Sequence, residues 1–88
     1  MDKLEDLRKK IDVLDVQLVQ LLHERLSVVE EIGILKKELG LNPLDAKRWN
    51  HVVSKSLDQA ESLGLKKEFV KKILDTIHAE ALQIERKI

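Results

Sequence analysis

Apolar residues recur at alternating steps of three and four positions along the first 39 residues of the chain. The series comprises Leu4, Leu7, Ile11, Leu14, Leu18, Leu21, Val28, Ile32, Leu35 and Leu39. This spacing predicts one helix over residues 3–39, with a heptad-type seam about five heptads long. Gly33 lies inside the pattern and is expected to weaken the helix only slightly.

Glycine and proline interrupt the rest of the chain only near Gly40–Pro43 and at Gly64. The segments between them predict two shorter helices, over residues 44–62 and 66–87. The predicted fold is therefore all-α, a single domain of three helices over residues 1–88. A helix of 37 residues is about 55 Å long, and neither shorter helix could cover it alone. We therefore expect a homodimer in which the long helices pack together.

The composition excludes several classes of function. Acidic and basic residues balance at 16 each and aromatic residues make up 2%, so neither a basic field nor stacking platforms for nucleic acid are expected. The chain has no cysteine, and His23, His51 and His78 lack metal-ligand spacing, so we expect no metal site. No apolar run is long enough for a membrane span, and the polar start is unlike a secretory signal. A cytoplasmic protein is expected, and the chain could be a domain of a longer polypeptide.

Arg25 occupies a seam position where the apolar pattern calls for leucine. Lys36 follows eleven residues later and points within about 20° of the same direction, about 16 Å along the axis. Asp45 and Arg48 lie near the start of the second helix, and Glu85 shares a face of the third helix with His78 and Ala81. Several fixed cations and few anions around one cavity suit a small ligand with more than one carboxylate.

Each of these residues also has a simpler explanation. An arginine in a heptad seam can fix the register or extend to solvent, and a lysine on a helix is commonly solvated. Asp45 could act only as an N-cap or in a weak surface pair. Trp49 could anchor a core or an interface. The periodicity by itself supports a dimeric helical protein with an anion-binding cavity.

Three segments of the sequence resemble the all-helical, AroQ-class chorismate mutases. They are LRKKIDVLDVQLVQLLHERLSVVEEIGILKK, the D-x-x-R of DAKRW, and IHAEALQIE, in the order and spacing of that family. The resemblance implies an intertwined dimer of three-helix subunits. It also implies conversion of chorismate, which carries two carboxylates, to prephenate in phenylalanine and tyrosine biosynthesis. No metal or organic cofactor is implied.

The resemblance also implies roles for individual residues. Arg8 matches the arginine that the partner subunit contributes to a substrate carboxylate, and Arg25 matches the arginine that binds a carboxylate within its own subunit. Lys36 matches the lysine that contacts the ether oxygen and a carboxylate. Asp45 matches the acidic residue near the substrate hydroxyl, and Arg48 an arginine lining that region.

Three positions depart from the family pattern. Trp49 stands where a glutamate commonly binds the substrate hydroxyl, and Ala81 stands where a small hydroxyl residue is common. Glu85 aligns with the glutamine that usually donates to the ether oxygen, although some members carry glutamate there. Only a protonated glutamate can donate a hydrogen bond, so we expect activity to favour mildly acidic pH if Glu85 lines the site.

Two other functions remain open at this point. Isochorismate-pyruvate lyases share the same fold and cationic pocket. A non-catalytic dimerisation module that binds chorismate or prephenate would also account for the cations, and the changes at Trp49 and Ala81 give this alternative some weight. The R-W-N run from Arg48 more weakly resembles mutase domains fused to an aromatic-pathway synthase, so a fused or associated enzyme is a further expected partner.

Overall fold

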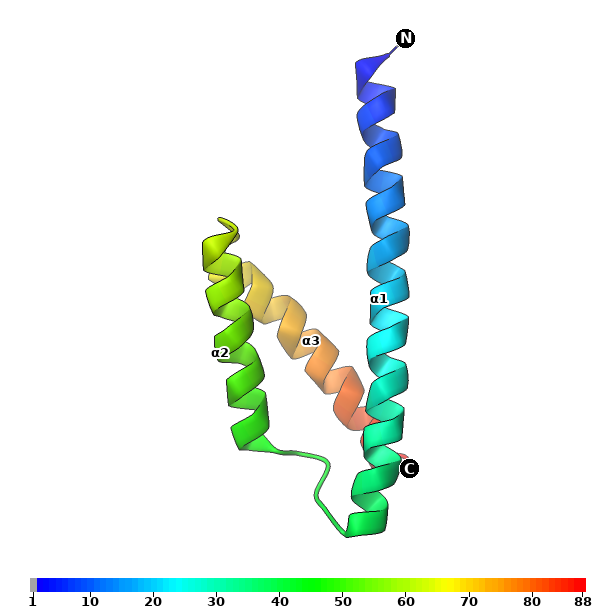
Figure 1. Ribbon diagram of the computed structural model, residues 1–88, viewed down its shortest axis with the longest axis vertical. Helices are drawn as coiled ribbons and strands as arrows, with labels where there is room; N and C mark the ends of the chain where they lie inside the picture. The colour runs from blue at the N-terminus through cyan, green and yellow to red at the C-terminus, as the bar shows by residue number, and fades with distance from the viewer. Residues whose placement is uncertain (1) are drawn as a thin grey trace.

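The computed structural model describes residues 2–88 as three helices joined by two short connections (Figure 1). Helix α1 spans Lys3–Leu39, α2 spans Ala46–Ser62 and α3 spans Lys67–Arg86. No strand occurs in this part of the chain. The all-α class and the very long first helix, both predicted from the apolar spacing, are confirmed.

Both ends of α1 carry standard helix-terminating features. The Asp2 side chain caps the N-terminus by accepting a hydrogen bond of 2.9 Å from the backbone N–H of Leu4. At the other end Gly40 adopts a left-handed conformation with φ of 70°, and its backbone N–H donates back to the last turn. Leu41 N–H also donates to the Lys36 carbonyl at 2.8 Å. These contacts end the helix where the glycine was expected to end it.

The shorter helices begin and end within one or two residues of the expected ranges. Asp45 is the N-cap of α2, so that helix begins at Ala46. The chain then turns through Gly64, which has φ of 74°, into α3. The N-cap position of α3 is Lys66, whose side chain makes no capping hydrogen bond. None of the three helices is long and apolar enough to cross a membrane.

The helices form an open arrangement. Figure 1 shows α1 upright, α2 beside it, and α3 crossing from the far end of α2 to the C-terminal half of α1. Helix α3 packs against both other helices, whereas residues 2–88 contain no packing of α1 on α2. The N-terminal part of α1 projects beyond the other two helices (Figure 1), so its seam there is not covered by another helix of residues 2–88.

One chain by itself buries very little apolar surface. Ala60 and Ala81 are the only buried hydrophobic residues within 2–88. The accessible surface of 7314 Å² compares with roughly 5,300 Å² for a compact monomer of this mass. The radius of gyration is 16.5 Å, against about 12 Å for a compact chain of this length. Helix α1 leaves Leu4, Leu7, Ile11, Leu14, Leu18 and Leu21 about half exposed or more.

Candidate functional site

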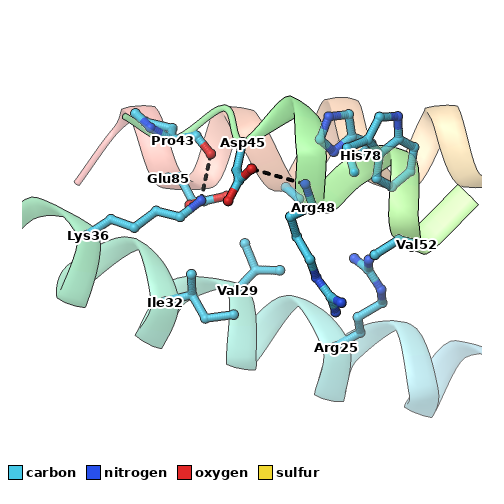
Figure 2. A pocket seen from close by; sticks show the side chains of 12 residues that line it. Arg25, Val29, Ile32, Lys36, Pro43, Asp45, Arg48, Val52, His78 and Glu85 are labelled. Atoms are coloured by element: carbon cyan, nitrogen blue, oxygen red, sulfur yellow. Dashed lines mark hydrogen bonds and ion pairs between the residues drawn. The ribbon is translucent and has the colours of Figure 1, made fainter. Parts of the chain in front are cut away.

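A pocket of about 190 Å³ lies where the C-terminal half of α1 faces α2 and α3. All three helices and the connection at Pro43 contribute to its wall (Figure 2). Apolar side chains form part of the lining, and charged side chains from each helix enter it. The lining residues are Arg25, Val29, Ile32, Lys36, Pro43, Asp45, Arg48, Trp49, Val52, His78, Ala81 and Glu85.

Arg25 extends from α1 into the pocket. Its Nη1 atom is buried and has no hydrogen-bond acceptor among residues 2–88. The residue as a whole is half-buried, and this nitrogen is shielded from solvent, so extension to solvent does not by itself explain the place of Arg25 in the seam. A buried guanidinium nitrogen without an acceptor carries a substantial desolvation cost, which an anionic ligand would relieve.

Lys36 is held at the other end of the pocket by two oxygen atoms. Its Nζ donates to the Pro43 carbonyl at 2.6 Å and lies 2.8 Å from Glu85 Oε1. The lysine side chain is 20% exposed and the glutamate side chain 8%, so this is not an ordinary solvated lysine. The contact with Glu85 is an ion pair whose angles are not those of a hydrogen bond. An ammonium group has three N–H donors, so Lys36 keeps capacity for a ligand.

Asp45 and Arg48 enter the pocket from the first turn of α2. Asp45 Oδ1 accepts a hydrogen bond of 3.0 Å from the backbone N–H of Arg48. The N-cap explanation of Asp45 is therefore confirmed, while no ion pair joins the two side chains in the described structure. Figure 2 shows the Arg48 side chain extending across the pocket toward α1, on the side where Arg25 enters. Its guanidinium is thus available to an anion.

An aromatic pair closes the wall between α2 and α3. The Trp49 indole and the His78 imidazole are stacked, with ring centroids 3.8 Å apart and an interplanar angle of 5°. Burial lowers the pKa of His78 below its ordinary value of 6.5, and the nearby positive charge of Arg25 lowers it further. Ala81, which is buried, lies one turn further along α3.

Seven of the eight residues singled out from the sequence share this pocket. The exception is Arg8, whose side chain is 63% exposed and pairs with Glu5 at 3.6 Å. Arg8 and Arg25 are seventeen residues apart on α1, about 25 Å along its axis, so one helix cannot present both to one small ligand.

His78 is a lining residue that the sequence analysis did not assign to the site. Its spacing of three from Ala81 and seven from Glu85 placed it on the same helix face, which was the available signal. The site contains no cluster of possible metal ligands, and none occurs elsewhere within residues 2–88. The polar groups of the site are instead three cations, an N-cap carboxylate, an ion-paired carboxylate and one imidazole.

The fold and the pocket together define an all-helical protein with a cationic site for a small anionic ligand. Comparison with known families gives a more specific assignment: the chain belongs to the chorismate mutase type II family, whose model matches residues 7–86. The resemblance drawn from the sequence segments is thereby confirmed.

Individual relatives are similar over most of the chain. The T-protein of Haemophilus influenzae is 32% identical over 74 residues, which cover 84% of this chain and 20% of that protein. The T-protein of Enterobacter agglomerans is 30% identical over 83 residues, which cover 94% of this chain and 22% of that protein. The chorismate mutase of Methanocaldococcus jannaschii is 29% identical over 72 residues, which cover 75% of this chain and 73% of that protein. The chain thus spans about a fifth of the length of each T-protein.

Proposed function

We propose that this protein catalyses the rearrangement of chorismate to prephenate. One observation carries the proposal: Arg25, Lys36 and Arg48 face a single pocket, and Arg25 Nη1 is buried there without an acceptor. In a chain of the chorismate mutase type II family, this arrangement suits a small dicarboxylate. Chorismate is such a molecule, and its two carboxylates match cations at the two ends of the pocket.

The binding geometry would favour the reactive shape of the substrate. Arg25 and Arg48 enter from opposite walls, and Lys36 lies toward the other end of the pocket (Figure 2). Clamping both carboxylates between these groups restricts chorismate to a compact conformer in which the bond-forming carbon atoms approach each other. Holding such a conformer removes an entropic part of the barrier before the reaction begins.

The chemical step requires no protein nucleophile. The reaction is a unimolecular pericyclic rearrangement in which a C–O bond breaks as a C–C bond forms. Negative charge grows on the ether oxygen as the C–O bond lengthens. Lys36, held in place by Pro43 and Glu85, has an N–H donor left to stabilise that oxygen. Preorganised donors at a position of developing charge contribute several kcal/mol in other enzymes.

The proposed active form is a homodimer. The extended α1 exposes a continuous apolar seam, and the chain exposes about 2,000 Å² more surface than a compact monomer of its mass. That excess lies within the range buried by obligate dimers. In an intertwined dimer, Arg8 would enter the partner subunit's pocket and add a cation that its own chain cannot place there.

The first test measures loss of chorismate by its ultraviolet absorbance. The purified chain is expected to convert chorismate to prephenate, and a Lys36→Met variant to lose at least about 100-fold in kcat/KM. Lys47→Met is the matched control because Lys47 is exposed on α2 and is not part of the pocket wall. A folded, dimeric chain without turnover would contradict the proposal.

A binding-only function is the second candidate, and one contact favours it. The Lys36–Glu85 ion pair neutralises the cation that would stabilise the ether oxygen. Tight prephenate binding without chorismate turnover would identify such a module. Release of pyruvate from isochorismate would instead identify the lyase activity considered from the sequence.

The association of this chain with a second enzyme is also a proposal. Because it matches about a fifth of each T-protein, we infer that it works beside a fused or associated aromatic-pathway enzyme. Stimulation of turnover by the second enzyme, added as a separate chain, would support this arrangement. The cytoplasmic location expected from the sequence stays a prediction.

A further inference from the structure

We propose that His78 is an additional binding residue for the ligand carboxylate held by Arg25, and that it takes up a proton when this carboxylate enters the pocket. The inference rests on the proposed function in one respect, because it takes a dicarboxylate as the ligand. It assigns a ligand contact to a side chain that the proposed mechanism does not use.

The position of His78 is fixed by packing. Its ring lies flat against Trp49 at 3.8 Å, which restricts rotation of the imidazole and leaves the ring edge directed away from the indole face. Neither ring nitrogen has a hydrogen-bond partner among residues 2–88. His78 from α3 and Arg25 from α1 lie toward the same end of the pocket, on opposite sides of it (Figure 2), and Arg25 is close enough to oppose protonation of His78. A carboxylate oxygen on Arg25 would therefore find an imidazole edge nearby.

The charges that shift the pKa of His78 belong to α1 and α3. Arg25 and, more weakly, Lys36 of α1 oppose protonation, whereas Asp75 and Glu85 of α3 favour it. Helix α2 contributes the uncharged Trp49 ring in direct contact, and places Arg48 and Asp45 in the same pocket wall. Burial is the largest influence and also disfavours the charged ring, so the pKa of His78 is lowered.

An anionic ligand changes the electrostatic influences on the pKa of His78 so that they favour the protonated ring. A carboxylate bound to Arg25 offsets the positive charge that opposes protonation, and it also provides an opposite charge beside the imidazole. The pKa of His78 is then higher in the complex than in the free protein. By linkage, the ligand binds more tightly as the pH falls through the interval between these two values.

Trp49 provides a direct readout because it is the sole tryptophan of the chain. A protonated imidazole stacked on an indole quenches its fluorescence more strongly than a neutral one. We would record Trp49 emission from about pH 5 to about pH 8.5, a range that brackets histidine titration, with and without saturating prephenate. The fluorescence transition should move to higher pH when prephenate is bound. It should remain in His23→Gln and His51→Gln variants and disappear in His78→Phe.

Affinity measured by calorimetry gives an independent result. The parent protein should bind prephenate about threefold to tenfold more tightly at about pH 6 than at about pH 8. His78→Gln retains an N–H donor but cannot take up a proton, so most of this ratio should be lost. His78→Phe, which keeps a stacked ring, should bind about tenfold more weakly at the acidic pH.

Two outcomes would overturn the inference. One is a Trp49 transition that stays at the same pH while calorimetry shows that prephenate is bound. The other is a His78→Gln variant that keeps the pH ratio of the parent. Chorismate turnover is measured separately: a shifted transition without turnover refutes catalysis and supports the His78 contact. If prephenate does not bind at all, the His78 inference fails, whatever the turnover.

Discussion

Gly33 decides how closely α3 can approach α1 beside the pocket, and replacing it with alanine tests that contact. It is the buried residue of α1. A Cβ atom at this position would lie 2.6 Å from Ile88 Cδ1, 3.1 Å from Glu85 Cγ and 3.3 Å from Glu85 Cα. The end of the Ile88 side chain can rotate away, but the Glu85 Cα belongs to the backbone of α3. The helix carrying Glu85 would therefore have to shift by a few tenths of an ångström.

Two opposing effects determine how much Gly33→Ala changes the free energy of unfolding. Alanine is favoured over glycine inside a helix by about 1 kcal/mol. Overpacking at a close helix contact costs about 1–3 kcal/mol. We expect Gly33→Ala to lower the free energy of unfolding by about 1 kcal/mol, which is about 4–8 °C in Tm for a domain of this size. Activity should fall as well, because the shift displaces Glu85 relative to Lys36.

The assay is urea denaturation at fixed protein concentration, combined with chorismate turnover. Ile88→Ala removes the shortest contact, so the double variant should be more stable than the sum of the single effects by about 0.5 kcal/mol or more. Gly40→Ala is the matched control: its φ of 70° makes alanine unfavourable, but nothing lies within 4 Å of the added Cβ. Ile88→Ala should not rescue that variant. If Gly33→Ala stabilises the protein with unchanged turnover, the reasoning about α3 is refuted.

Three further predictions concern the pocket. Glu85→Gln should raise kcat, because an amide can donate to the ether oxygen where an ionised carboxylate cannot; a kcat equal to or below the parent's would contradict this. Arg8→Ala and Arg25→Ala chains should each be nearly inactive, and mixing them after unfolding should restore about a quarter of the parental activity if each site takes one arginine from each subunit. The lowered pKa of His78 means that its neutral ring stabilises the folded state fully above about pH 6.5, and this contribution is lost as the pH falls through the folded-state value. A His78→Phe variant should therefore lose less stability than the parent between pH 7.5 and 5.5 in urea denaturation, a range of about two units around the histidine value.

The site was predictable from the sequence to the extent that one helix determines it. Arg25 and Lys36 belong to α1, and a period of 3.6 residues fixes their common direction without any knowledge of packing. Asp45 and Arg48 are likewise positioned by the first turn of α2, where the cap bond holds them. For these residues, local geometry was sufficient to indicate one cationic face.

The contacts that cross between helices were decided only by the tertiary structure. The pattern of apolar residues treated Gly33 as a slight weakness of the long helix, yet it is where Glu85 and Ile88 approach α1. The stack of Trp49 on His78 joins residues that are 29 positions apart, and neither periodicity nor composition specifies that pairing. The ion pair of Lys36 with Glu85 depends on the angle at which α3 crosses α1.

The sequence by itself therefore determined the three helices, the excess apolar seam of α1 and the class of ligand that its cations suit. It did so because helix formation and face assignment depend on residues within a few turns of one another. The tertiary structure decided which charges are paired, which imidazole lines the pocket and which donors stay open. These depend on side chains from separate helices meeting within a few ångströms, a distance that the crossing angle of the helices sets.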